Sequence, residues 1–200
     1  MTTTTTSVRT LISRARDGDR DALGYLLEHH RPYLKLLARR MIGERLESRL
    51  DESDIVQQTC LSVFGRIEGF DGDEPDQFVA WLRTIHEHNV RNALRDHVST
   101  QKRTVNREQA LGADGAVREV APAQQSSPSQ RLMQGERAVR LAAALQKLAP
   151  DQREAVRLRY LEGWSLAEIS EHTGRTKHSI AGLIKRGLSG LRIELRDEHH

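Results

Sequence analysis

The sequence WSLAEISEHTGRTKHSIAGLIKRGLSGLR, from Trp164 to Arg192, predicts two short helices joined by a tight turn. Ser165 and Glu168 have the spacing of a capping box, which opens the first helix. Gly174 marks the turn, because glycine readily adopts the left-handed backbone that ends a helix. Thr176 can cap the second helix. One side of the second helix is an apolar stripe made of Ile180, Leu183, Ile184, Gly187, Leu188 and Leu191.

The opposite side of the second helix is polar and basic. Lysine and arginine can neutralise phosphates or bond to guanine edges, and the amides of a helix N-terminus can bind a phosphate. These features predict a helix-turn-helix whose second helix enters the DNA major groove, and they favour it over a solvated basic helix in an ordinary three-helix bundle. The predicted DNA-contacting residues are Arg175, Thr176, Lys177, His178, Ala181, Gly182, Lys185 and Arg186.

The composition of the 200 residues indicates an all-α fold. Hydrophobic residues make up 37% of the chain, aromatic residues 4% and charged residues 30%, which suffices for modest helical cores rather than one large core. Cys60 is the single cysteine, so an intramolecular disulfide is excluded. The N-terminus lacks the apolar segment of a signal peptide and no run is long enough to cross a membrane, so we expect a cytoplasmic protein without membrane insertion.

The chain divides into two helical regions and a linker. Helical periodicity covers residues 8–97 and returns at residues 136–196, while residues 98–135 are expected to be a flexible linker because they include GADGAVREVAPAQQSSPSQ. Pro32 predicts a break or a kink near His30, so we expect two helical pieces in the first long helical run. The threonine run at the N-terminus is expected to be a disordered tail.

Charge is segregated within the first helical region. Between positions 51 and 76 there are eight acidic residues and one basic residue, Arg66, whereas the following segment is mainly basic. An acidic surface suits a basic protein partner, and a basic helix suits nucleic acid. The first region therefore offers two surfaces of different kinds beside the helix-turn-helix.

The order of these segments resembles the sigma-70 family of bacterial transcription initiation factors, in its small extracytoplasmic-function (ECF) form. DALGYLLEHHRPYLKLLARRMIG looks like the first helix pair of sigma domain 2. DESDIVQQTCLSVFGRIEGF looks like the segment that docks on the clamp helices of the RNA polymerase largest subunit. FVAWLRTIHEHNVRNALRDH is similar to the helix that captures and melts the promoter −10 element. LQKLAPDQREAVRLRYLEGWSLAEISEHTGRTKHSIAGLIKRGLSGLR matches the domain 4 pattern that reads the −35 element.

The resemblance implies that residues 8–97 are sigma domain 2 and residues 136–196 are sigma domain 4. It implies core RNA polymerase and promoter DNA as partners, and an anti-sigma factor as a further partner common in the family. Gln58, His88 and Asn92 depart from the glutamate, asparagine and aspartate that the family commonly has there. The implied polymerase-binding residues are Asp51, Asp54, Gln57 and Gln58, and the implied −10 contacts are His88, Asn89, Arg91, Asn92 and Arg95.

Other classes of function find less support. No phosphate-binding glycine loop and no set of nucleophile, base and orienting acid can be assembled, so we expect neither an enzyme nor a cofactor. His86 and His88 lie two residues apart on a helix and do not share a face, so no metal site is expected. The alternative is a stand-alone helix-turn-helix regulator whose N-terminal bundle senses a signal or dimerises. Such a regulator binds duplex DNA unaided, whereas a sigma factor needs core polymerase.

Overall fold

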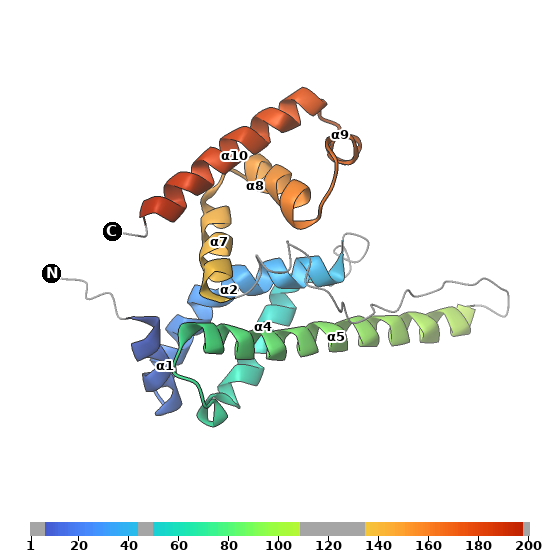
Figure 1. Cartoon of the computed structure of the whole chain (residues 1–200). Helices are drawn as coiled ribbons and strands as arrows, with labels where there is room; N and C mark the ends of the chain where they lie inside the picture. Colours follow the sequence, from blue (N-terminus) through green and yellow to red (C-terminus); the bar gives the residue numbers. More distant parts are fainter. Residues whose placement is uncertain (1–6, 44–49, 109–134, 198–200) are drawn as a thin grey trace.

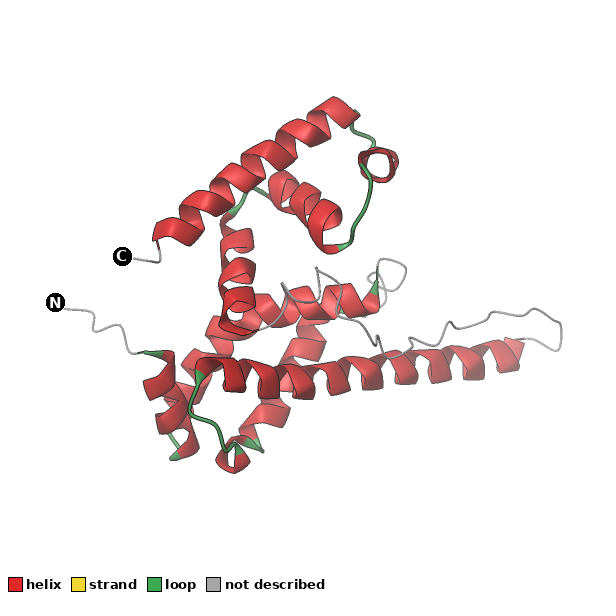
Figure 2. Ribbon diagram, viewed as in Figure 1, coloured by secondary structure: helices red, strands yellow, loops and turns green. Residues whose placement is uncertain are grey.

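The computed structural model describes residues 7–43, 50–108 and 135–197, and every element in these ranges is helical (Figures 1 and 2). The predicted all-α class is confirmed. The threonine run and residues 109–134 of the predicted linker lie outside the described residues. The elements in chain order are α1 (Val8–Arg16), α2 (Arg20–Ile42), α4 (Glu52–Phe64), the 3-10 helix η1 (Ile67–Gly69), α5 (Pro75–Glu108), α7 (Gly135–Lys147), α8 (Pro150–Val156), the π-helical turn η2 (Arg157–Leu161), α9 (Leu166–Thr173) and α10 (Lys177–Asp197).

The helices α1, α2, α4 and α5 form a bundle around a shared apolar core. Aspartates begin two of them: the Asp19 carboxylate accepts from the Ala22 amide of α2, and Asp51 accepts from the Ser53 amide of α4. The core of this bundle is apolar, and its largest completely buried side chains include Tyr33, Leu34, Phe78, Leu82, Leu23 and Leu26.

Helix α2 is continuous from Arg20 to Ile42 with Pro32 in its interior, so the predicted break near His30 is wrong. An interior proline removes a hydrogen bond to the carbonyl four residues earlier and costs about 3 kcal/mol. Buried leucines on both sides of Pro32, such as Leu27 and Leu34, contact the same core. Each contributes about 1.5–3 kcal/mol when fully buried, which outweighs the cost of the proline.

Helix α5 extends to Glu108, beyond the boundary that we expected at position 97. Residues 98–108, predicted as the start of the linker, therefore continue the helix. The sequence contains neither glycine nor proline between positions 76 and 111, so nothing in it requires the helix to end at the edge of the bundle.

Helices α8, α9 and α10 form a second, smaller core, which includes Leu158, Ile169 and Ile180. Arg157 is 5% exposed, and its guanidinium bonds to the carboxylates of Glu154 and Glu162, at 2.7 and 2.9 Å, across the η2 turn. A buried charge needs such partners to avoid a large desolvation cost. This charged cluster fixes the connection from α8 towards α9.

Helix α7 joins the two halves of the chain. It contacts α2 and α5 on one side and α10 on the other, and its buried residues share one apolar cluster with the N-terminal bundle (Figure 1). At its first turn the Glu136 amide donates to the Asp76 carboxylate at 2.7 Å, and His29 Nε2 lies 3.6 Å from Glu136 Oε1. At its last turn Lys147 pairs with Glu194 of α10 at 2.7 Å. The two helical regions are therefore packed against each other.

Candidate DNA and polymerase interfaces

The helix-turn-helix forms as its local sequence predicts. The Ser165 amide donates to the Glu168 carboxylate at 2.7 Å and the Glu168 amide donates to Ser165 Oγ at 3.2 Å, so both halves of the capping box are present. These bonds hold the pKa of Glu168 below its ordinary value. Gly174 has a φ of 67°, in the left-handed region, and Thr176 Oγ1 accepts from the Ser179 amide at 3.2 Å to cap α10.

The predicted DNA-contacting residues of this element lie together on an open face. All are exposed except Gly182, which is half-buried. Figure 1 shows α9 and the first turns of α10 standing clear of α2 and α5. The Arg175 guanidinium is held by Asp151 of α8 at 2.7 Å, and the Arg175 carbonyl accepts from Ser170 Oγ at 2.6 Å. The turn before α10 is therefore anchored to both preceding helices.

The two glycines singled out on α10 have different surroundings. A Cβ atom at Gly187 would lie 2.7 Å from Val156 Cγ2 and 3.3 Å from the Gln152 carbonyl oxygen, so this glycine allows α10 to approach α8 closely. A Cβ atom at Gly182 would meet only the tip of the Arg186 side chain, at 3.4 Å or more. Gly182 therefore leaves the backbone of α10 accessible on the side predicted to face DNA.

The predicted polymerase-binding residues lie at the start and on the outer face of α4. Asp54, Gln57 and Gln58 are exposed at the helical spacing that places them on one face. Asp51 is also exposed, but its carboxylate caps the helix. The structure adds Leu61, 60% exposed, and Phe64, 43% exposed, which the sequence reasoning did not select. Their absence from the buried stripe of α4 was the signal that could have identified them.

The predicted −10 contacts on α5 divide between two faces. His88, Arg91 and Arg95 are exposed, and the half-buried Asn92 shares their face because the four are spaced as i, i+3, i+4 and i+7. Glu87 pairs with Arg91 at 2.9 Å, and Asn92 accepts from Arg95. The remaining residue, Asn89, points elsewhere.

Asn89 is turned towards α4. Its side-chain amide donates to Thr59 Oγ1 at 3.3 Å and to Ser62 Oγ at 3.2 Å. One residue in a helix corresponds to a rotation of about 100°, which separates Asn89 from the face that carries His88. The structure therefore does not bring Asn89 to the predicted nucleic-acid surface.

His86 is fully buried beside Thr59, whereas His88 is exposed, so the two histidines occupy different faces. Burial lowers the pKa of His86 to about 4 and raises the pKa of the Cys60 thiol. Within the described ranges no group of three His, Cys, Asp or Glu side chains is placed to hold a metal ion.

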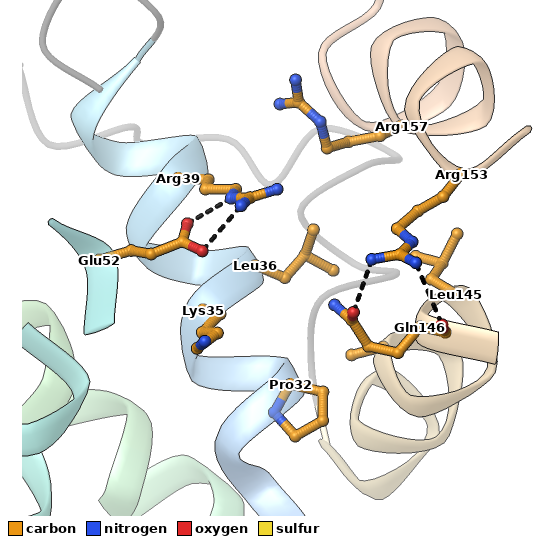
Figure 3. A pocket seen from close by; sticks show the side chains of 10 residues that line it. Pro32, Lys35, Leu36, Arg39, Glu52, Leu145, Gln146, Arg153 and Arg157 are labelled. Carbon is orange, nitrogen blue, oxygen red and sulfur yellow. Dashed lines mark hydrogen bonds and ion pairs between the residues drawn. The ribbon is translucent and has the colours of Figure 1, made fainter. Parts of the chain in front are cut away.

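A small cavity between α2, α7 and α8 has a basic lining (Figure 3). Its guanidinium groups already have partners: Arg39 bonds to Glu52, Arg153 donates to Gln146 Oε1 at 2.8 Å, and Arg157 bonds to Glu154 and Glu162 on either side of η2. Carboxylates thus compensate the charges of Arg39 and Arg157, whereas the Arg153 guanidinium bonds to neutral oxygens. As a separate finding, none of the helices that the structure describes has both the length and the apolar character needed to cross a membrane.

A helix-turn-helix with an open basic face, joined to a bundle with a second basic face, defines a DNA-binding protein. Residues 26–104 match the family model "Sigma-70 region 2" and residues 138–190 match "Sigma-70, region 4". The two matches cover more than half of the chain, in the order that the family has. The chain belongs to the sigma-70 family.

The curated relatives that the chain resembles are sigma factors of the ECF form. The chain is 29% identical over 188 residues to the ECF RNA polymerase sigma factor BldN of Streptomyces coelicolor. The match covers 94% of this chain and 66% of BldN, which is just under two thirds of that protein. The chain is 27% identical over 189 residues to the ECF RNA polymerase sigma factor SigD of Mycobacterium tuberculosis, covering 92% of this chain and 82% of SigD. Sigma factors are not enzymes, and these matches do not favour the stand-alone regulator.

Two solved structures match most of the chain, and their TM-scores are low. CnrH in complex with the cytosolic domain of CnrY is 26% identical, with a TM-score of 0.37, and the match covers 94% of this chain and 97% of that chain. The sigma factor RpoE in complex with the anti-sigma factor NepR from Bartonella quintana is 23% identical, with a TM-score of 0.31, over 88% and 98%.

Proposed function

We propose that this chain binds core RNA polymerase through α4 and directs it to promoters, with α5 capturing the −10 element and α10 reading the −35 element. The observation that carries the proposal is that all three faces are exposed on the two regions that match sigma-70 models. On this proposal residues 8–97 act as sigma domain 2 and residues 136–196 as sigma domain 4.

The α4 face has the composition of a protein-binding surface. Leu61 and Phe64 supply exposed apolar area, and Asp54, Gln57 and Gln58 supply polar groups on the same helix. Interfaces commonly combine an apolar centre with a polar rim. The clamp helices of the polymerase largest subunit are the partner that the family resemblance implies. An anti-sigma factor, the further partner expected from that resemblance, would compete for this face.

The α5 face suits a single DNA strand. His88 and Asn92 offer hydrogen-bonding groups, and Arg91 and Arg95 offer positive charge on the same side of the helix. Proteins hold single strands with a basic track and side chains that receive unstacked bases. Extruding a base costs a few kcal/mol, so promoter melting needs a surface that binds the separated strand.

Reading both promoter elements requires the two halves of the chain to separate. The −10 and −35 elements lie about 25 base pairs apart, which is about 85 Å of B-DNA. In the packed structure Arg91 is connected to Lys185 through α5 back to Asp76, then along α7, and then along α10 from Glu194. At 1.5 Å per residue these three segments span about 23 Å, about 20 Å and about 14 Å. Even laid end to end, these three segments fall well short of about 85 Å. We infer that polymerase holds the two readers apart and that the chain alone binds promoters poorly.

The first test is co-elution with sigma-free bacterial core RNA polymerase on a gel-filtration column. We expect a one-to-one complex, and we expect promoter opening only from that complex. A protein that elutes as a dimer, forms no complex and shifts duplex DNA unaided would overturn the proposal in favour of a stand-alone regulator.

The docking assignment is tested by Asp54→Lys, with Asp71→Lys as the matched control. Both carboxylates are exposed, but Asp71 lies outside α4. Charge reversal at Asp54 places a cation on the proposed contact face, so we expect it to abolish co-elution with core polymerase, while Asp71→Lys retains it. Circular dichroism should show that both variants are folded. Unchanged binding by Asp54→Lys would remove α4 from the interface.

A further inference from the structure

A polar network lies inside the otherwise apolar contact between α4 and α5. Thr59 Oγ1 donates to the Ile55 carbonyl at 2.8 Å and lies 2.9 Å from His86 Nδ1. Asn89 Nδ2 donates to the same Thr59 oxygen and to Ser62 Oγ. Thr59 and His86 are both completely buried, so the bonds of Thr59 to Ile55 and His86 form away from water, while the two bonds of Asn89 are part-buried.

The network connects the backs of the two proposed binding faces. Ser62 Oγ donates to the carbonyl of Gln58 at 3.0 Å, and the Gln58 side chain belongs to the α4 docking face. Asn89 directly follows His88, which belongs to the α5 reading face. A single set of directional bonds therefore lies between the surface proposed for polymerase and the surface proposed for DNA.

Hydrogen bonds between α4 and α5 can fix the rotation of one helix on the other, which apolar packing does poorly. Apolar contacts are non-directional, so they tolerate small rotations and slides of one helix on another. Buried polar networks, when satisfied, specify a unique arrangement. Burying His86 favours its neutral form and lowers its pKa to about 4, which keeps the ring uncharged beside the Thr59 hydroxyl. An apolar pair would fill this space without a comparable desolvation cost.

We propose that Asn89 is a positioning residue, which together with Thr59 fixes the rotation of α5 on α4. Docking of α4 on polymerase then presents His88, Arg91 and Asn92 to the DNA strand at the correct angle. The proposal rests on the proposed function. It differs from the expectation that Asn89 itself contacts the strand, because the Asn89 amide is occupied by the two α4 hydroxyls.

Three single substitutions separate positioning from direct contact. Thr59→Val keeps the shape of the side chain and removes the hydroxyl, Thr59→Ser keeps the hydroxyl, and Asn89→Ala removes the amide. Each variant is assembled with core polymerase. Two affinities are then measured: that for core polymerase, and that for a fluorescent single-stranded oligonucleotide selected from a random pool by the wild-type holoenzyme.

We expect Thr59→Val and Asn89→Ala to leave the affinity for core polymerase unchanged and to weaken strand binding by about fivefold, as for the loss of one or two hydrogen bonds. The double variant should be no weaker than either single variant, because both remove the same interaction. Thr59→Ser should bind the strand like the wild type. Thermal unfolding of each variant reports whether it is folded.

Two outcomes would overturn the proposal. If Asn89→Ala weakens strand binding while Thr59→Val does not, or if their effects multiply, Asn89 acts on DNA directly. If neither variant changes strand binding, the network contributes to packing alone. Failure of the proposed function looks different, because then the wild-type chain would form no holoenzyme.

Discussion

Gly187 offers a quantitative test of how α10 is held against α8. In the interior of a helix, replacing glycine by alanine is favourable by about 1 kcal/mol if the new methyl group has room. At Gly187 the methyl carbon would lie 2.7 Å from Val156 Cγ2 and 3.3 Å from the Gln152 carbonyl oxygen. Carbon atoms prefer separations of about 3.5–4.0 Å, so α10 would have to move away from α8.

The net effect of Gly187→Ala follows from two opposing contributions. Overpacking of this kind costs about 1–3 kcal/mol, and the gain in helix propensity offsets about 1 kcal/mol of it. We therefore expect a loss of about 0–2 kcal/mol in the free energy of unfolding. Gly182→Ala is the matched control, because its methyl group would meet only the mobile tip of Arg186. That variant should gain up to about 1 kcal/mol.

The assay combines urea unfolding, followed by circular dichroism, with binding of the holoenzyme to a duplex promoter. Gly187→Ala should unfold at a lower urea concentration than the wild type. Gly182→Ala should unfold at a higher concentration and yet bind the promoter more weakly, because its methyl group lies between the α10 backbone and the DNA. Increased stability of Gly187→Ala would refute the close-packing argument. Unchanged promoter binding by Gly182→Ala would refute the approach of DNA at that position.

Two further predictions concern acid stability and the first turn of α7. Burial lowers the pKa of both His30 and His86 to about 4, so the unfolded chain binds protons that the folded chain does not as the pH falls from 6.5 to 4. The free energy of unfolding should therefore be highest above pH 6.5 and fall by roughly 2–3 kcal/mol per histidine as the pH approaches 4. A free energy of unfolding, measured in urea, that does not change with pH over this range would contradict this. Asp76→Ala removes the acceptor of the Glu136 amide and should cost about 1 kcal/mol, loosening α7 from the bundle. Energy transfer between dyes on α5 and α10 should fall in Asp76→Ala and not in the control Asp71→Ala; equal values would show that this bond does not hold the two halves together.

Several features of this chain could be predicted because they depend on residues close in sequence. The capping box of Ser165 and Glu168, the turn at Gly174 and the cap at Thr176 each involve contacts within three or four positions, and all are present. The buried stripe of α10 was predictable for a similar reason, since helical periodicity relates apolar positions to one face. Local geometry therefore determined the helix-turn-helix almost completely.

Other features depended on contacts between segments that are distant in sequence. Pro32 predicted a break, but the core on both sides of it stabilises one continuous helix. Asn89 stood among residues that the family resemblance assigned to DNA, yet the hydroxyls of α4 turn it inward. Leu61 and Phe64 were not selected, although they lie off the buried stripe of α4, and the packed bundle shows how much of each stays exposed, 60% and 43%.

The sequence by itself thus determined the helical class, the helix-turn-helix with its caps and apolar face, and the family to which the order of its segments belongs. The tertiary structure decided how each helix is rotated against its neighbours, and hence which polar residues remain available to partners. It also showed α7 packed on α2 and α5, so that the two DNA readers are held together. The physical reason is that periodicity relates residues within one helix, whereas burial depends on the surfaces that other helices bring to it.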